Sequence, residues 1–349
     1  MLDEFCDTPK QLLEDMRDSK EVDVIVPYSC ALCNYCTQVC PKDVDLKDVF
    51  FKLKTYIVDL ENTPPKELGY NTVKSHQNNS FSKLFSTDIK GLQTEQKKRI
   101  FFPGCSLSSY SPDIVRDTYQ YLKEKLPGIG ITLKCCGNPT YSMGQRDKFN
   151  DLYDTVQNEF QNSGIEEVIV ACQNCYKIIK QNSPDIKVIS LWEVISKYGV
   201  PESKIGYYKY LDKVFSIHDP CPTRNESKIH DSIRNITDQL GINISEMKFI
   251  REKTLCCGSG AMIGITNKKL ASAQRQKRAE QSNSDYIITY CEECVESMKK
   301  GGKKSIHILD LLFDDSIDKT FDQKSINVTN KWINRYRVKR RISSYGKDK

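Results

Sequence analysis

Ten of the fifteen cysteines in this 349-residue chain form two sets with the same spacing. Each set has a lone cysteine, then the tripeptide Cys-Cys-Gly, then Cys-x-x-Cys, and corresponding cysteines lie 116, 121 and 119 residues apart. Flanking sequences match as well, such as "EVIVACQNC" and "YIITYCEEC". The chain therefore contains an internal repeat, which predicts two domains of the same fold. The first cysteine group is Cys105, Cys135, Cys136, Cys172 and Cys175, and the second cysteine group is Cys221, Cys256, Cys257, Cys291 and Cys294.

Each repeat alternates short apolar segments with longer amphipathic ones. In the first repeat we expect strands at 99–103, 130–134, 167–171 and 186–189, and helices near 111–126, 145–162 and 191–198. Strand–helix alternation of this kind predicts a parallel sheet flanked by helices. The cysteines are predicted to lie just past strand ends, where open α/β sheets place their ligand sites.

The adjacent cysteines of each Cys-Cys-Gly tripeptide need a special backbone. Neighbouring side chains on a strand point to opposite faces, so both thiols reach one metal centre only where the chain turns. Gly137 and Gly258 permit such a turn. A disulfide between adjacent cysteines would be strained and easily reduced. A zinc site would use four of the five thiolates, whereas the full set favours a multi-iron cluster.

A second type of cysteine motif lies near the N-terminus. Cys30, Cys33, Cys36 and Cys40 stand in "CALCNYCTQVCP", the C-x2-C-x2-C-x3-C-P spacing of a bacterial ferredoxin that binds a 4Fe–4S cluster. A zinc knuckle rarely uses three thiolates in so short a run. In two-cluster ferredoxins the fourth cysteine ligates the other cluster, and no second run exists here. We therefore expect Cys6 to complete the cluster, with Cys40 as the alternative ligand and a free thiol as the alternative role of Cys6.

The cysteine pattern and the flanks "FPGC", "CCGNP", "HDPC" and "CCGSG" resemble the cysteine-rich, or CCG, domain. This domain occurs in pairs in heterodisulfide reductase catalytic subunits, and in the iron–sulfur subunits of anaerobic glycerol-3-phosphate dehydrogenase, glycolate oxidase and lactate-utilisation enzymes. With the ferredoxin run, the resemblance covers residues 28–315. It implies a non-cubane 4Fe–4S cluster in each cysteine group, with zinc as the alternative occupant of one. Related fused subunits carry two ferredoxin runs, whereas this chain carries one.

The predicted fold class is α/β, with an N-terminal helical ferredoxin-like module followed by two homologous CCG domains with parallel sheets. Leu46, Phe50, Leu53 and Ile57 keep helical spacing and predict an amphipathic helix after the ferredoxin run. The predicted boundaries are 1–60 for the helical module, 61–97 for a linker, 98–205 and 206–318 for the two CCG domains, and 319–349 for a basic tail.

Charge and apolar content restrict the compartment and the partners. The acidic, polar start "MLDEFCDTPK" and the short apolar runs predict a cytoplasmic protein, where fifteen cysteines indicate metal or redox chemistry rather than disulfides. Residues 331–349 hold eight Lys or Arg and one acidic residue, and the whole chain is +6. Because Trp332 and Tyr336 interleave with these charges, we expect peripheral contact with an anionic membrane on its inner face. Nucleic-acid binding is not expected, since the basic block lacks a folded reading element.

Together these features predict an iron–sulfur oxidoreductase subunit that passes electrons between the ferredoxin-type cluster and the CCG clusters. The expected acceptor is a disulfide, a thiol or a quinone. The chain shows no flavin or nicotinamide motif, so we expect a flavoprotein dehydrogenase or a ferredoxin as redox partner. His218, Asp219 and Arg224 flank Cys221 and are candidates to supply a proton or bind an anion, with a hydrogen bond to cluster sulfur as the alternative role.

Two other functions remain open at this stage. One is an electron-transfer subunit of an anaerobic 2-hydroxy-acid or glycerol-3-phosphate dehydrogenase complex. The other is a non-catalytic zinc or iron scaffold that docks partner subunits. Iron and acid-labile sulfide content distinguishes the scaffold from the redox proteins.

Overall fold

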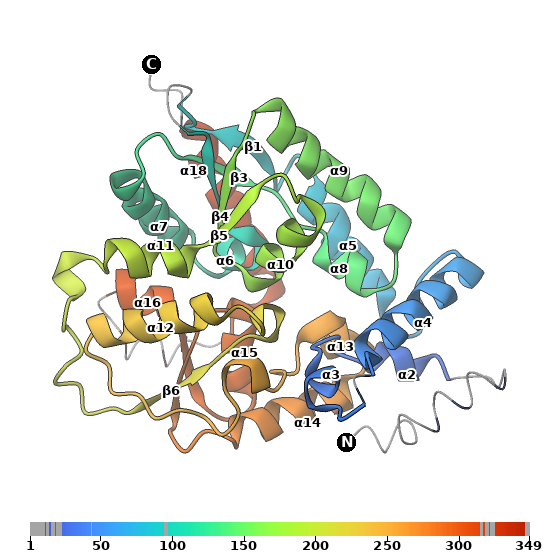
Figure 1. Ribbon diagram of the computed structural model, residues 1–349. Helices are drawn as coiled ribbons and strands as arrows, with labels where there is room; N and C mark the ends of the chain where they lie inside the picture. The colour runs from blue at the N-terminus through green and yellow to red at the C-terminus, as the bar shows by residue number, and fades with distance from the viewer. Residues whose placement is uncertain are drawn as a thin grey trace.

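The computed structural model describes residues 23–42, 44–93, 97–314 and 325–345, together with residues 11, 14, 18, 317 and 321. Cys6, the expected fourth ligand of the N-terminal cluster, lies outside the described residues. Figure 1 shows the two repeats one above the other, with the N-terminal helices beside the second repeat.

The first repeat forms a five-stranded sheet in the order β1-β3-β2-β4-β5. Strands β2 (Arg99–Phe102), β3 (Gly130–Leu133), β4 (Glu167–Val170) and β5 (Lys187–Ser190) run parallel, and β1 (Thr87–Lys90) pairs antiparallel with β3 at one edge. The helices after β2, β3 and β5 are α7 (Pro112–Lys125), α9 (Arg146–Asn162) and α11 (Leu191–Tyr198). Strands β3 and β4 are buried along their whole length, as expected for a parallel sheet covered on both faces. The predicted strands and helices of this repeat are confirmed.

The second repeat keeps a smaller sheet of three parallel strands, β6 (Phe215–His218), β7 (Tyr286–Thr289) and β8 (Lys304–His307). Its main helices are α12 (Ser227–Gln239), α14 (Lys268–Ala279), α15 (Glu292–Lys300) and α16 (Ile308–Phe313). The α/β class with parallel sheets is thus confirmed for both repeats.

One strand of the first repeat has no full counterpart in the second. Where β3 would be expected, a single parallel bridge joins Phe215 and Ile244. The following segment is instead held by Asp219, which accepts hydrogen bonds from the Arg251 amide and, through its carbonyl, from the Thr254 hydroxyl. The prediction that every cysteine follows a strand end is therefore wrong for the pair at 256–257.

Short helices precede the first sheet: α2 (Ile25–Tyr28), α3 (Tyr35–Val39) and α4 (Leu46–Glu61). Helix α4 begins where the Asp45 side chain accepts a hydrogen bond from the Asp48 amide, and Leu46 and Phe50 pack on Val26. These helices lie beside α13 (Ile263–Thr266) in the second repeat and α8 (Asn138–Ser142) in the first (Figure 1). The predicted amphipathic helix is confirmed.

The segment predicted as a linker, 61–97, is folded in its described part. It contains α5 (Tyr70–Phe81) and strand β1. The buried positions of α5 are Tyr70, Val73, Gln77 and Ser80, which share one helical face. The prediction failed because two of these four positions are polar, so the face does not appear in the apolar pattern.

The segment predicted as a basic tail, 319–349, is also folded in its described part. Helix α18 (Val328–Ser344) packs against α6 (Gly104–Tyr110), α7 and the β1–β3 edge of the first sheet. Val338 and Ile342 are buried, and the Trp332 ring lies 4.7 Å from that of Phe85, centroid to centroid. Trp332, which the sequence predicts at a membrane, thus contacts Phe85, whereas Tyr336 of the same prediction is 39% exposed.

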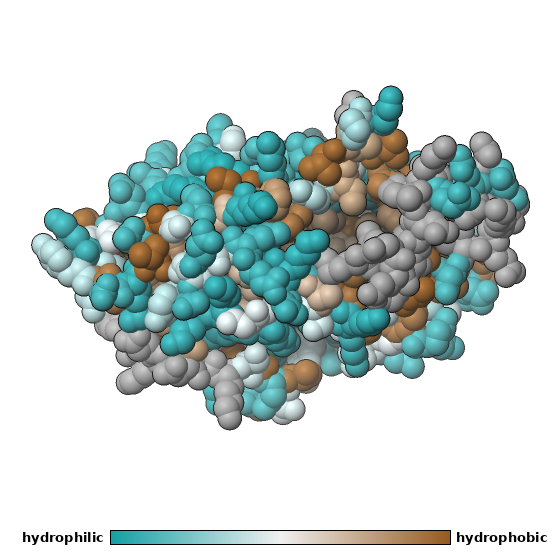
Figure 2. All heavy atoms as spheres, turned by 90° about the horizontal axis from the view of Figure 1, so that it is seen from below, coloured by the Kyte–Doolittle hydropathy of each residue, from teal (hydrophilic) through white to brown (hydrophobic). Residues whose placement is uncertain are grey.

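On the face shown in Figure 2, hydrophilic residues cover most of the described surface and hydrophobic residues form separate patches. None of the described helices is long and apolar enough to cross a membrane.

Candidate metal centres

The first cysteine group is assembled at one edge of the first sheet. Cys105 lies in α6 after β2, the adjacent pair follows β3, and the Cys-x-x-Cys pair begins α10 (Gln173–Asn182) after β4. The Sγ atoms of Cys105 and Cys135 are 3.8 Å apart. The Cys175 thiol forms hydrogen bonds with Cys136 and Cys172. All five predicted cysteines are therefore brought together, in the place that α/β sheets use for ligands.

The second cysteine group is equally compact. The Cys257 and Cys294 Sγ atoms lie 3.3 Å apart, and Cys256 forms hydrogen bonds with Cys221 and Cys257. A cavity of about 160 Å³ opens beside this group. Four of the five cysteines line the cavity: Cys221, Cys257, Cys291 and Cys294. The described cysteines of both groups are free thiols, so the sulfurs meet without forming disulfides.

The Cys-Cys-Gly tripeptides turn as predicted. Gly137 and Gly258 have φ angles of 77° and 85°, a region that only glycine adopts readily. In each tripeptide the glycine N–H donates to the sulfur of the first cysteine, over 3.5 Å to Cys135 and 3.3 Å to Cys256. A Cβ on Gly258 would lie 2.8 Å from the Ala271 carbonyl oxygen. The glycine thus allows the turn and supplies an amide hydrogen to the sulfur.

The N-terminal cysteine loop, residues 30–40, lies against the second cysteine group. Two left-handed residues, Leu32 and Asn34, fold the loop tightly, and the Leu32 amide donates to the Cys30 Sγ over 3.4 Å. The Cys33 and Cys256 thiols lie close enough for each to shift the pKa of the other, that of Cys33 upward and that of Cys256 downward. A Cβ on Gly260 would lie 2.5 Å from the Ala31 carbonyl oxygen, so the two backbones meet closely. Sequence reasoning missed this contact, since no local pattern records which repeat the loop touches.

Interactions between neighbouring thiols lower the pKa of Cys105 and Cys172 in the first cysteine group and of Cys256 in the second. Hydrogen bonding from Cys135 holds the pKa of Cys105 well below its usual value, and Cys221 does the same for the pKa of Cys256. The pKa values of the donors Cys135 and Cys221 are raised well above the usual value by the same bonds. Metal binding at either group would therefore release several protons, because thiolates are the ligands.

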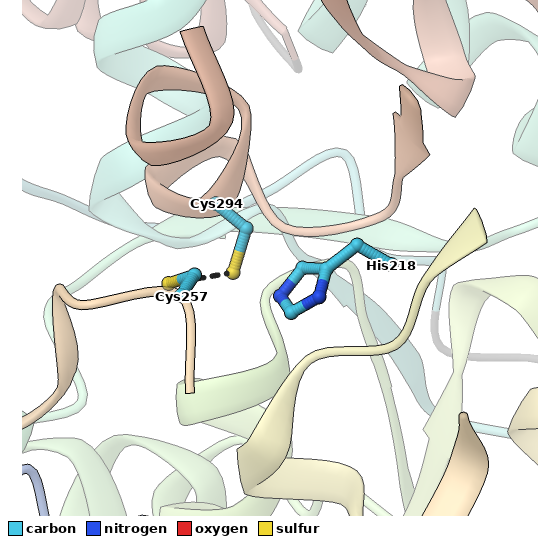
Figure 3. A group of neighbouring side chains, drawn as sticks. All are labelled: His218, Cys257 and Cys294. Carbon is cyan, nitrogen blue, oxygen red and sulfur yellow. Dashed lines mark hydrogen bonds between the residues drawn. The ribbon is translucent and has the colours of Figure 1, made fainter. Parts of the chain in front are cut away.

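The three polar residues that flank Cys221 have different surroundings. The His218 ring nitrogen lies within 4.8 Å of the sulfurs of Cys257 and Cys294, toward which the ring turns in Figure 3. Burial lowers the pKa of His218 to about 3, so the ring is neutral at physiological pH. Although burial opposes it, hydrogen bonding to Arg234 lowers the pKa of Asp219 to about 2. Asp219 is thus an ion-pair partner rather than a proton carrier.

Arg224, the third flanking residue, holds the N-terminal cysteine loop. Its Nε and a terminal nitrogen donate to the Cys33 carbonyl oxygen over 3.2 and 3.1 Å, and its other terminal nitrogen donates to the Glu252 carbonyl. Its hydrogen-bonding groups are therefore engaged by the backbone. This geometry assigns Arg224 to docking the loop on the second repeat.

Comparison with known proteins adds family information. The model of the cysteine-rich domain, CCG, matches residues 100–180 and 215–299. An uncharacterized iron–sulfur protein of Methanococcus maripaludis is 26% identical over 88% of this chain and 65% of its own length. A subunit of the fumarate reductase (CoM/CoB) of Methanothermobacter marburgensis is 25% identical over 82% of this chain and 60% of its own. A subunit of the dihydromethanophenazine:CoB–CoM heterodisulfide reductase of Methanosarcina mazei is 23% identical over 89% of this chain and 79% of its own.

The chain thus spans less than two thirds of the length of the first two of these relatives. Among solved structures, an aspartate racemase of Picrophilus torridus matches with 12% identity and a TM-score of 0.30, covering 68% of this chain and 99% of its own. That likeness is too weak to carry an argument. The two matched ranges of the family model contain the two cysteine groups, so the chain carries two copies of the cysteine-rich CCG domain.

Proposed function

We propose that this protein is an iron–sulfur oxidoreductase subunit that delivers electrons to a disulfide, thiol or quinone-type acceptor. The support is the convergence of ten free, closely spaced thiols in two CCG domains with relatives named as iron–sulfur and reductase proteins. Iron–sulfur clusters bound to these thiols would supply one-electron transfer. The residue types fit, since thiolates are the cluster ligands and glycine amides point at the sulfurs.

We assign one cluster to each set of cysteines. The N-terminal loop, as a ferredoxin-like module, would hold a 4Fe–4S cluster through Cys30, Cys33 and Cys36, with Cys40 or Cys6 as fourth ligand. The first and second cysteine groups, in domains 98–205 and 206–318, would each hold a further 4Fe–4S cluster of the non-cubane kind. Zinc in one of the groups is the alternative.

The observation that carries this assignment is the contact between Cys33 and Cys256. It joins the N-terminal loop to the second cysteine group, so that two sets of sulfur ligands meet directly inside the protein. Such close approach favours electron exchange between the two sites, which a scaffold that only docks partners would not need.

The cavity beside the second cysteine group suggests the charge of the acceptor. Lys47 and Lys177 both line it, and neither forms an ion pair among the described residues. Burial, followed by repulsion from Lys47, lowers the pKa of Lys177. The carboxylates of Asp45, Asp48 and Glu293 also line the cavity, so its charge is mixed and both acceptor types stay in the proposal. Lys177→Ala tests them: a higher KM for anionic disulfides with an unchanged KM for a quinone indicates an anionic acceptor.

The partner is proposed to be a flavoprotein dehydrogenase or a ferredoxin. The second candidate function, electron transfer within a 2-hydroxy-acid or glycerol-3-phosphate dehydrogenase complex, uses the same clusters with a different partner. Reduction of the purified protein by each type of donor distinguishes the two.

The decisive experiment is metal analysis with EPR on protein purified without oxygen. We expect about twelve irons per chain for three clusters of the 4Fe kind. Cys136→Ala and Cys257→Ala should each remove a different EPR signal and both should abolish electron transfer. Four irons together with zinc, and activity in both variants, would contradict the proposal.

The fourth ligand of the N-terminal cluster is tested in the same way. Cys40 lies close enough to Cys36 to raise that thiol's pKa, after burial as the larger cause. If Cys6 is the ligand, Cys6→Ala converts the cluster to a 3Fe form and Cys40→Ala has little effect. The reverse pattern assigns Cys40.

A further inference from the structure

Three basic side chains of the described chain have no exposed surface at all: Lys54, Arg278 and Arg335. Each lies beside a different set of cysteines. Among the described residues none of the three forms an ion pair with a carboxylate. Burying a cation without a partner costs several kcal/mol even after the protein relaxes, so three such residues in one chain need an explanation.

Lys54 belongs to the N-terminal cysteine loop. From α4 its ammonium group donates to the Cys30 carbonyl oxygen and to the Ser142 carbonyl oxygen, each over 3.3 Å. Burial lowers the pKa of this amine to about 8, and the Cys30 sulfur acts in the opposite direction. Among the described residues, the group that acts electrostatically on this amine is therefore the sulfur of Cys30, whose own pKa is raised by burial.

Arg278 belongs to the second cysteine group. From α14 its Nε donates to His218 Nδ1 over 3.0 Å, and its terminal nitrogens donate to Gln281 and Thr254. Asp219 acts on it electrostatically, but that carboxylate is already held through two hydrogen bonds by Arg234. The remaining electrostatic partners of Arg278 are thiols of the second cysteine group, with Cys257 and Cys294 the largest.

His218 lies between Arg278 and the sulfurs of the second cysteine group. Because His218 Nδ1 accepts a hydrogen bond and the ring is neutral, its proton is on Nε2. The Nε2 atom is buried and has no hydrogen-bond partner among the described residues, and the ring turns toward Cys257 and Cys294 (Figure 3). A buried N–H aimed at sulfur is a donor for a cluster rather than a metal ligand.

Arg335 belongs to the first cysteine group, although it lies 160 residues beyond Cys175 in the chain. From α18 its Nε donates to the Phe85 carbonyl oxygen over 3.0 Å, and its terminal nitrogens donate to Ser80. Helix α18 packs against α6, which carries Cys105. The positive charge of Arg335 lowers the pKa of Cys105, after hydrogen bonding from Cys135, burial and hydrogen bonding from His76, and it opposes the rise in the pKa of Cys135.

The repeat itself does not explain this third cation. Counting from the lone cysteine and from the Cys-Cys-Gly tripeptide, the first-repeat positions that match His218 and Arg278 are Phe102 and Gln157. Neither carries a charge. The cation of the first group lies on a helix outside the repeat. The positive charges at the two groups therefore do not occupy matching positions of the repeat.

We propose that Lys54, Arg278 and Arg335 are the buried counter-charges of three separate iron–sulfur clusters, one at each set of cysteines, and that each raises the reduction potential of its own cluster. The proposal rests on the proposed function and deepens it. It assigns to each of the three clusters one residue that sets its reduction potential. Four or five thiolates outweigh the positive charge of the iron–sulfide core, so each cluster is an anion. Reduction adds a further negative charge, which a nearby cation stabilises in a low-dielectric interior.

The test is an EPR-monitored redox titration of Lys54→Met, Arg278→Met and Arg335→Met, with iron and sulfide analysis. Each variant should keep its iron and shift one signal to a more negative midpoint potential, a different signal in each variant. Signals are assigned with Cys33→Ala, Cys257→Ala and Cys136→Ala. Arg337→Met, an exposed position two residues along α18, should shift none.

Charge-retaining variants keep the test decisive if a methionine variant loses iron or fails to fold. Lys54→Arg, Arg278→Lys and Arg335→Lys should keep iron and shift the potential less than loss of the charge does. Loss of iron in spite of a retained charge, or methionine variants that keep all potentials unchanged, would overturn the proposal. Wild-type protein without iron would instead refute the proposed function itself.

Discussion

A buried carboxyl group between the two repeats gives the stability of this protein a predictable dependence on pH. Asp310, near the start of α16, is 4% exposed. One of its oxygens accepts a hydrogen bond from the Tyr110 hydroxyl over 2.6 Å and from the His307 amide over 3.1 Å. Burial is the largest effect and raises the pKa of this carboxyl from 3.8 to about 7. The folded state therefore holds a proton that the unfolded state releases between these two values.

The sign and size of the effect follow from proton linkage. As pH falls from 7 to 4, the folded protein takes up a proton and its free energy of unfolding increases, by at most about 1.4 kcal/mol per pH unit. Across the whole window this amounts to about 4 kcal/mol. Above pH 7 the carboxyl is ionised in both states and contributes no further slope. Asparagine has no such proton, so Asp310→Asn should lack the dependence.

The assay is urea unfolding of the wild type and Asp310→Asn between pH 4.5 and 8, without oxygen, with the difference taken at each pH. Effects of other titrating groups cancel in that difference. We expect Asp310→Asn to gain on the wild type by about 3 kcal/mol between pH 4.5 and 8. Asp285→Asn, at an exposed loop position, should give a constant difference. A constant difference for Asp310→Asn as well, or a wild type that gains on Asp310→Asn with rising pH, would refute the reasoning.

Two further outcomes test how the segments outside the repeats are held. Gly144→Ala should lower the free energy of unfolding by about 3 kcal/mol, because φ is +87° and the new Cβ would lie 2.6 Å from the Lys54 carbonyl carbon in α4. The control Gly302→Ala, at φ +92° with open space around it, should lower it by about 1 kcal/mol in the same unfolding assay. Deleting residues 325–349 removes α18 and with it Arg335, so iron analysis should show loss of the first group's cluster alone, and full iron content would contradict this.

The sequence predicted what depends on local patterns. Period and spacing placed the strands of the first repeat and brought the first cysteine group together, since strand ends of a parallel sheet meet at one edge. The turn at Gly137 was predictable because adjacent cysteines on a straight strand cannot face one site. These inferences required no knowledge of which helices and strands pack against one another.

What could not be predicted depends on contacts between distant segments. Helix α5 buries Gln77 and Ser80, and α18 buries Arg335, so their inner faces look like surface in an apolar pattern. The meeting of Cys33 with Cys256 joins residues more than 200 positions apart. The sequence also did not predict that the second repeat lacks a full counterpart of β3. Asp219 holds that segment through hydrogen bonds rather than through a strand ladder, and these contacts join distant residues.

The two cysteine groups are equivalent in sequence but not in environment. The second group contacts the N-terminal loop through Cys256 and has its cation within its own repeat, on α14. The first group takes its cation, Arg335, from α18, which lies outside both repeats. Because hydrogen bonds and nearby charges set the potential of a cluster, two identical ligand sets in such different surroundings should differ in reduction potential. The difference in surroundings comes from segments outside the two repeats, the N-terminal loop and α18.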